Sequence, residues 1–138
     1  MERLKERIDV ATRAAARLSE AACLPNPGDI ERDAIIQRFE FTFEAVWKAA
    51  QACLFVVEGM DVSSPKGVIR ACREVGLLEE TDAVLALRMA DDRNLTVHTY
   101  NESLAAQIYE RILDYHLLLA KWLDAIQTRS MGTGNLPL

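Results

Sequence analysis

The chain has 138 residues, a formal net charge of -5 and a composition that is 50% hydrophobic and 27% charged. These values are typical of one folded domain rather than a disordered segment, and the acidic balance argues against broad, non-specific binding to nucleic acid. No run approaches the roughly 18 apolar residues of a membrane span, and the charged N-terminal sequence MERLKERID lacks the apolar stretch of a signal peptide. We therefore expect a cytoplasmic protein that does not contact a membrane.

The three cysteines, Cys23, Cys53 and Cys72, predict neither a disulfide framework nor a zinc site. Their number is odd and their spacing fits no CxxC pair. All three lie in apolar, helix-like surroundings, where a reduced thiol behaves as a small hydrophobic group. A chain with only two histidines also cannot build a histidine-rich metal site. A carboxylate-only site stays open, but the ExxH signature of di-iron bundles is missing, and we expect no metal and no cofactor.

The first half of the chain predicts two long helices. Apolar residues recur at spacings of three and four over residues 2–22, and LPNPGD then breaks the pattern, with Asp29 as the expected N-cap of the next helix. That helix covers about residues 30–58 and ends at Gly59. Its apolar stripe is unusually wide, which predicts packing on more than one side, either within the bundle or at a dimer interface. The helix also carries a polar strip at spacings of four. The residues that widen the stripe are Phe41, Trp47, Leu54 and Phe55, and the strip consists of Glu40, Glu44 and Lys48.

The second half predicts two shorter helices and a third long one. Ser64 before Pro65 is a helix-start signal, because proline suits the first turn. A short helix through about Glu74 and another over residues 80–92 follow, and the periodicity then lapses. The last long helix covers about residues 102–127, with Asn101 as its N-cap.

These elements predict an all-α fold. Three long and two short helices joined by brief loops favour an antiparallel, up-and-down helical bundle formed by residues 1–127. The remaining residues, 128–138, show no periodicity, and we expect them to form a flexible C-terminal tail.

The most informative polar segment follows the predicted helix over residues 80–92. It holds Asp92, Arg93, Asn94, His98 and Tyr100 within a few positions. Arginine offers a planar fork that suits phosphate, and histidine exchanges protons near neutral pH. An imidazole that deprotonates a ribose 2′-hydroxyl, with a guanidinium that stabilises the crowded phosphorane, would cleave RNA without a metal.

A purely structural interpretation of the same residues stands beside the catalytic one. Asp92 and Arg93 can form exposed ion pairs that contribute under about 1 kcal/mol. His98 can close a helix end, and Tyr100 can pack with its hydroxyl group satisfied. An Arg-x4-His spacing alone does not decide between the two.

Three segments together resemble a known family, the nucleotidyltransferase substrate-binding proteins of the HEPN superfamily. They are RDAIIQRFEFTFEAVWK (Arg32 to Lys48), SPKGVIR (Ser64 to Arg70) and DDRNLTVHTYNE (Asp91 to Glu102). The segments occur in the family's order, and the resemblance covers about residues 1–127.

The resemblance implies a helical homodimer that associates with a minimal nucleotidyltransferase encoded beside it, in a toxin–antitoxin-like pair. In related HEPN toxins an Arg-x4-6-His motif forms a metal-independent ribonuclease site, with two copies facing each other across the dimer. Arg93 and His98 match this motif, and Tyr100 completes its Arg-x4-His-x-Tyr variant. In some related pairs the nucleotidyltransferase attaches AMP to that tyrosine. By this analogy Tyr100 is the modification acceptor, and Asp92 and Asn94 are supporting polar residues.

Three hypotheses follow from the sequence. The preferred one is a binding module, the substrate-binding partner subunit of a minimal nucleotidyltransferase. The main alternative is a ribonuclease toxin whose substrate is RNA and whose catalytic residues are Arg93, His98 and Tyr100. The third is a helical dimer without chemistry, in which alanine at these positions changes only stability.

Overall fold

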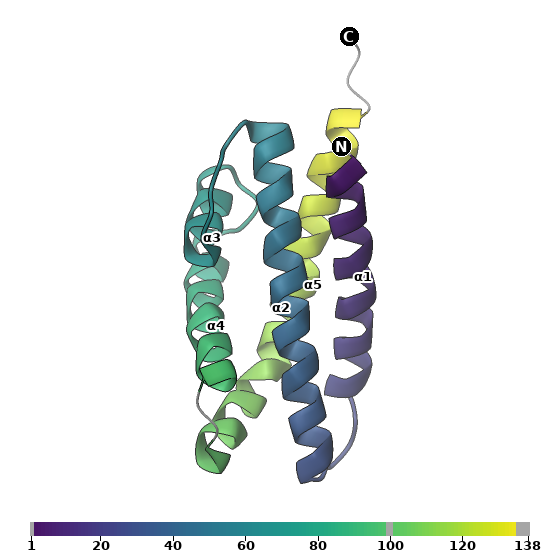
Figure 1. The fold of residues 1–138 in the computed structure, drawn as a ribbon, viewed down its shortest axis with the longest axis vertical. Helices are drawn as coiled ribbons and strands as arrows, with labels where there is room; N and C mark the ends of the chain where they lie inside the picture. The colour runs from purple at the N-terminus through teal and green to yellow at the C-terminus, as the bar shows by residue number, and fades with distance from the viewer. Residues whose placement is uncertain (1, 99–100, 135–138) are drawn as a thin grey trace.

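The structure is a computed structural model that describes residues 2–98 and 101–134 of the chain (Figure 1). Five helices make up most of this part. In chain order they are α1 (Glu2–Ala22), α2 (Asp29–Glu58), α3 (Pro65–Glu74), α4 (Glu80–His98) and α5 (Glu102–Gly134).

The helices form an up-and-down bundle, so the predicted all-α class and bundle are confirmed. In Figure 1, α1 runs down, α2 runs up, α4 runs down and α5 runs up again, with α2 in the middle of the molecule. The helices α1, α2 and α5 pack against one another, and α3 and α4 cover the other side of α2. The fourth helix is not short, however: its 19 residues nearly equal the 21 of α1.

Most of the helix-end signals act as predicted. The Ser64 side chain accepts a hydrogen bond from the backbone N–H of Gly67, and the Asn101 side chain accepts one from Leu104. Gly59 adopts a left-handed conformation with φ of 69° and ends α2. The N-cap of α2 was predicted wrongly: it is Gly28, and Asp29 is the first helical residue, where its negative charge favours the positive helix end.

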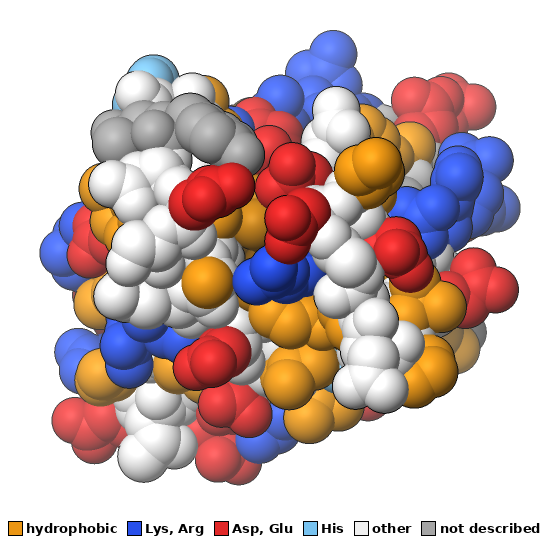
Figure 2. All heavy atoms as spheres, turned by 90° about the horizontal axis from the view of Figure 1, so that it is seen from below, with side chains coloured by type: hydrophobic (Ala, Val, Ile, Leu, Met, Phe, Trp, Pro, Cys, Tyr) orange, Lys and Arg blue, Asp and Glu red, His pale blue; other side chains and the backbone are white. Residues whose placement is uncertain are grey.

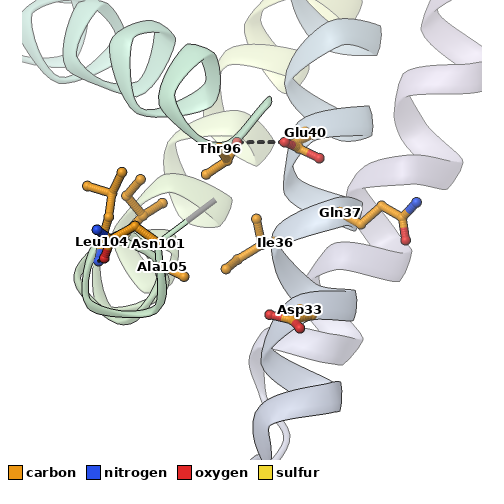
Figure 3. Close-up of a pocket in the computed structure, with 9 residues that line it drawn as sticks. Asp33, Ile36, Gln37, Glu40, Thr96, Asn101, Leu104 and Ala105 are labelled. Atoms are coloured by element: carbon orange, nitrogen blue, oxygen red, sulfur yellow. Dashed lines mark hydrogen bonds between the residues drawn. The ribbon is translucent and has the colours of Figure 1, made fainter. Parts of the chain in front are cut away.

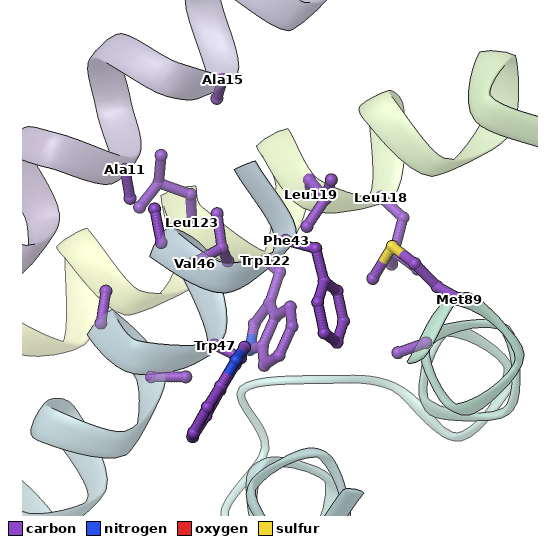
Figure 4. Close-up of a cluster of buried hydrophobic side chains, with 14 of the residues drawn as sticks. Ala11, Ala15, Phe43, Val46, Trp47, Met89, Leu118, Leu119, Trp122 and Leu123 are labelled. Atoms are coloured by element: carbon purple, nitrogen blue, oxygen red, sulfur yellow. The ribbon is translucent and has the colours of Figure 1, made fainter. Parts of the chain in front are cut away.

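The core lies between α2 and the helices on both of its sides. Ring–ring packing joins Phe39 to Phe43 and to Tyr115, with centroid distances of 6.5 and 5.5 Å. Figure 4 shows Phe43 beside Trp122 and facing Met89 of α4, so aromatic rings from α2 fill the space toward α4 and α5. These contacts fix α4 against α2, and they thereby fix the polar residues that follow Met89.

The last helix extends beyond its predicted end. α5 continues to Gly134, seven residues after residue 127, so the segment 128–134 is helical. Two contacts in this extension explain its order: Arg129 donates a hydrogen bond to Glu58 and another to the carbonyl of Val75. Because these partners lie on α2 and after α3, apolar periodicity could not reveal them. No helix in residues 2–98 and 101–134 combines the length and apolarity needed to cross a bilayer.

Thiol labelling should distinguish the three cysteines. Cys53 and Cys72 are buried, and burial raises the pKa of both thiols, that of Cys72 to about 12. Cys23 is exposed in the turn after α1. We expect iodoacetamide at mildly alkaline pH to add one group to the native protein, at Cys23, and three after denaturation, as measured by intact mass. Rapid labelling of a second thiol in the native protein would show that the core packing is wrong.

Candidate functional site

The polar segment singled out in the sequence is the end of a helix, not an irregular loop. Asp92, Arg93, Asn94 and His98 all belong to α4, whose last residue is His98. The expectation that helical order lapses after residue 92 is therefore wrong. Polar side chains hold these last turns against the neighbouring helices, and a search for apolar periodicity does not detect such contacts. Tyr100 lies outside the described residues.

Arg93 is held by an acidic residue of α2. Its Nη2 lies 2.9 Å from Oε2 of Glu44, and its guanidinium lies over the Phe43 ring, 6.0 Å from the centroid. Nη1 makes a weaker contact with the side chain of Asn94, at 3.4 Å. The Nε group of Arg93 is buried and has no hydrogen-bond partner among the described residues. The guanidinium is thus fixed in place while part of its hydrogen-bonding capacity stays unused.

The Glu44 carboxylate contacts three hydrogen-bond donors. Besides Arg93, Oε2 accepts a hydrogen bond from the Trp47 indole at 2.9 Å, and Oε1 lies 3.2 Å from Nζ of Lys48. Burial raises the pKa of this carboxyl, but the hydrogen bonds from Trp47 and Lys48 and the positive charges of Arg93 and Lys48 outweigh burial. The net effect is a pKa below the ordinary value of 4.5. Glu44 is therefore a carboxylate at neutral pH and neutralises much of the Arg93 charge.

This lowered pKa predicts how the ion pair depends on pH. Because the folded state prefers the carboxylate, Glu44 stabilises the fold above pH 4.5, and this contribution is lost as the pH falls through the folded pKa. The Arg93 and Glu44 side chains are 25% and 31% exposed, so Glu44→Gln should lower the free energy of unfolding at pH 7 by only about 1 kcal/mol. In urea denaturation the difference between the wild type and the variant should shrink as the pH is lowered from 7 to below 4.5. A constant difference between them over this range would contradict the charge-based explanation.

Asp92 is a buried residue that connects two helices. It is 4% exposed, and its carboxylate accepts two hydrogen bonds from Arg111 of α5, at 2.7 and 2.9 Å. The hydroxyl group of Tyr115 donates to the same carboxylate at 2.5 Å. Burial first, and then the hydrogen bond to Asp92, raise the pKa of Tyr115, so the phenol stays protonated. Asp92 thus joins α4 to α5 one residue before Arg93.

His98 is exposed, and the helix directs it away from Arg93. Five residues on an α-helix correspond to a rotation of about 140° and a rise of about 7.5 Å. The side chain of Arg93 reaches toward α2, so the imidazole of the same chain projects from another side of α4. One chain alone does not direct the two groups at one point.

Two further residues belong to the site and were not among the predicted ones. The Thr96 hydroxyl lies 2.6 Å from Oε2 of Glu40 and 2.8 Å from the carbonyl of Arg93. Figure 3 shows this pair at one side of a groove between α2 and the start of α5. The polar strip of Glu40, Glu44 and Lys48 on an otherwise apolar helix was the signal for these contacts, since such a strip must face either solvent or polar partners.

The groove beside the motif is small and acidic. Its volume is 290 Å³, and Asp33, Glu40, Thr96 and Asn101 supply its polar groups. Figure 2 looks at this end of the bundle, where acidic side chains surround basic ones. Within residues 2–98 and 101–134, no three His, Cys, Asp or Glu side chains come close enough to hold a metal ion. The local charge suits a cationic ligand or protein segment better than a free phosphate.

Comparison with known proteins identifies relatives over almost the whole bundle. A family model described as nucleotidyltransferase substrate binding protein like matches residues 6–128. A Thermus thermophilus protein of known structure is 57% identical, with 84% of this chain and 98% of that chain covered and a TM-score of 0.81. None of the curated proteins compared matches the chain.

Two more distant structures share the fold. HI0074 from Haemophilus influenzae, described as having the fold of a substrate binding domain of a nucleotidyltransferase, is 22% identical over 91% of this chain and 98% of that one, with a TM-score of 0.62. A tri-AMPylated Shewanella oneidensis HEPN toxin in complex with MNT antitoxin is 15% identical over 91% and 96%, with a TM-score of 0.68. At these identities the likeness concerns the fold alone.

Proposed function

The chain belongs to the nucleotidyltransferase substrate binding protein family, and from this premise we propose that it is the partner subunit of a minimal nucleotidyltransferase in a toxin–antitoxin-like pair. The observation that carries the proposal is the extent of the family match, which runs from α1 nearly to the end of α5. The Shewanella and Haemophilus structures support it, because both share this fold and both are described together with a nucleotidyltransferase or an MNT antitoxin.

The pair would act in the cytoplasm, with this chain as a homodimer. The geometry of α4 favours a second copy near the site, since Arg93 and His98 of one chain point in different directions. A two-fold axis close to the end of α4 would bring His98 of one subunit toward Arg93 of the other. Sedimentation equilibrium tests this arrangement, and a monomer at micromolar concentration would contradict it.

The proposed role predicts that the nucleotidyltransferase depends on this chain. The experiment measures transfer of labelled nucleotide by the purified nucleotidyltransferase encoded beside this gene, with and without the chain, over the four common nucleoside triphosphates. Transfer should rise strongly when the chain is added, or the label should appear on the chain itself. Equal transfer in both reactions would remove the basis for a substrate-binding role.

A ribonuclease toxin is the second candidate. It is favoured by the exposed imidazole of His98 and by the fixed Arg93 guanidinium, whose side chain is 25% exposed. In this reaction His98 would take the proton of a ribose 2′-hydroxyl as the 2′-oxygen bonds to phosphorus, and Arg93 would stabilise the pentavalent centre. The P–O5′ bond then breaks, the 5′-oxygen takes a proton from the imidazolium or from water, and a 2′,3′-cyclic phosphate remains. Asp92 and Asn94 would support the arginine, and AMP on Tyr100 would block it by adding negative charge. The pairing of Arg93 with Glu44 counts against this candidate, because a phosphate must compete with a carboxylate.

Cleavage of RNA in EDTA separates the two candidates. The wild type should cleave and His98→Ala should not, if the site is catalytic. Intact mass must first show that Tyr100 carries no nucleotide, since a modified sample would be silent. Equal cleavage by both proteins would indicate a contaminating nuclease. Absence of cleavage by the unmodified wild type would exclude the ribonuclease candidate and leave only the partner-subunit role.

A further inference from the structure

A basic groove runs along α1 and α2, and at Gln37 it borders the groove that Glu40 and Thr96 line. It has two sections, of 790 and 460 Å³, both lined by α1 on one side and α2 on the other. We call it the basic groove; the residues that define it are Arg3, Arg7, Arg13, Arg17, Arg38, Phe41, Lys48 and Phe55.

Two phenylalanine side chains of α2 are exposed in the basic groove. Phe41 and Phe55 are 61% and 62% exposed, although the sequence pattern expected them to pack. They lie 14 residues apart on α2, with Lys48 midway, so all three share one side of the helix. On α1, Val10 is exposed and Ala14 is small, and both line the section that holds Phe41. Phe41 and Phe55 therefore place two exposed rings about 21 Å apart along the α2 axis, with the cation of Lys48 between them.

The rims are strongly positive. Six basic residues line the two sections, against one acid among the lining residues, Asp61. Within the described part of the chain the five arginines form no ion pair, and Lys48 shares Glu44 with Arg93. This concentration of charge is notable in a chain whose formal net charge is -5. A folded protein that leaves such a groove uncovered suggests an acidic ligand with apolar groups.

The positive charge of the basic groove and the spacing of its two phenylalanines distinguish between the possible kinds of ligand. A symmetric contact between two copies of this chain would bring two basic faces together, and an asymmetric contact would build a ring or an open filament rather than a dimer. Single-stranded nucleic acid stacks successive bases on neighbouring rings, whereas Phe41 and Phe55 are about 21 Å apart. A helix lying along the groove instead presents side chains every seven residues, which is the period of Phe41, Lys48 and Phe55.

We propose that the basic groove binds an amphipathic helix with acidic flanks that belongs to the partner nucleotidyltransferase. This inference rests on the proposed function and adds the docking surface and the chemistry of the segment that occupies it. Apolar residues of the helix pack on Phe41, Val10 and Phe55, and its carboxylates pair with Arg13 and Arg17 on one rim and Arg38 on the other. The lining of the basic groove does not include Arg93 or His98, and the groove is linked to Arg93 only through Lys48, which shares Glu44 with it.

Isothermal titration of this chain with the purified nucleotidyltransferase encoded beside it tests the proposal. Phe41→Ser with Phe55→Ser should weaken binding about 100-fold, since exposed aromatic anchors dominate such interfaces. Arg13→Glu with Arg17→Glu should weaken it about tenfold and reduce its salt dependence. Because these four side chains are exposed, thermal unfolding of the free chain should stay close to that of the wild type.

A matched variant controls for the loss of exposed apolar surface. Val84→Ser with Leu117→Ser removes side chains that are 65% and 63% exposed on α4 and α5, and it should bind like the wild type. If the wild type binds and the Phe41 and Phe55 variant binds equally well, the docking surface is wrong while the partner role stands. If the control weakens binding as much as the groove variant, the groove is also not the specific contact. If the wild type does not bind at all, both proposals fail.

Discussion

Asp92→Ala should lower the free energy of unfolding by about 3 kcal/mol, because it leaves a buried ionic network without its acceptor. The Asp92 carboxylate is the common partner of Arg111 and Tyr115, and its side chain is 6% exposed. Alanine removes three hydrogen bonds and leaves a guanidinium and a phenol facing a small void. Urea denaturation at pH 7, followed by circular dichroism, measures the difference.

The neighbouring acid provides the control for this change. Asp91 forms an ion pair with Lys66, and both side chains are well exposed. Asp91→Ala should therefore lower the free energy of unfolding by less than about 1 kcal/mol. Tyr115→Phe removes only one hydrogen-bond donor, so its effect on the free energy of unfolding should lie between those of Asp91→Ala and Asp92→Ala. The effects of Asp92→Ala and Tyr115→Phe should not be additive. Equal effects of Asp91→Ala and Asp92→Ala would contradict the network.

Phe43→Ala should lower the free energy of unfolding by about 3 to 5 kcal/mol. It should also disturb the site, because the same ring packs in the core and lies against the Arg93 guanidinium. Phe43 is 1% exposed, and it fills the space between α2 and α4 (Figure 4). Its ring also lies beneath the guanidinium of Arg93. Removal of the ring creates a cavity and frees Arg93 on one side. Calorimetry should show a large fall in Tm, and the NMR signals of the Arg93 guanidinium should broaden.

Phe43→Leu separates packing from the contact with the cation. Leucine keeps much of the volume but has no aromatic face, so most of the stability should return while Arg93 stays less ordered. If leucine restores the Arg93 signals completely, the ring has no specific role beneath the guanidinium. If alanine itself costs under about 1 kcal/mol, the core has been assigned incorrectly.

Local signals in the sequence were sufficient for the helices and most of their ends. Ser64, Asn101 and Gly59 act through groups within a few residues of themselves, so their effects can be predicted without a tertiary structure. The extent of α4 and α5 could not be predicted in this way. The contacts that order those ends, such as Thr96 with Glu40 and Arg129 with Glu58, join residues 56 and 71 positions apart.

The site was located by its residue types, but its geometry was not predictable. The Arg-x4-His pattern indicated Arg93 and His98, and nothing near them in the sequence indicated that Glu44, 49 residues away, holds the arginine. Asp92 was expected to support the site, and its carboxylate instead faces Arg111 and Tyr115 of α5. Long-range pairs of opposite charge carry no periodic signal, so only the tertiary structure identifies them.

For Phe41 and Phe55 the pattern left two alternatives open, packing within the bundle and a dimer interface. Both continue the wide apolar stripe of α2, which favoured packing within the bundle, yet α1 leaves them uncovered. The helices α1, α3, α4 and α5 all contact α2, yet among the described residues none of them covers these two rings, which are 61% and 62% exposed. A stripe too wide for the bundle is therefore a sign of an external partner.

The most direct test of the partner role is a binding measurement between this chain and the minimal nucleotidyltransferase proposed as its partner. The two purified proteins should co-elute in size-exclusion chromatography at micromolar concentration, in a complex that persists at physiological salt. Separate elution of two folded proteins at that concentration would contradict the central claim.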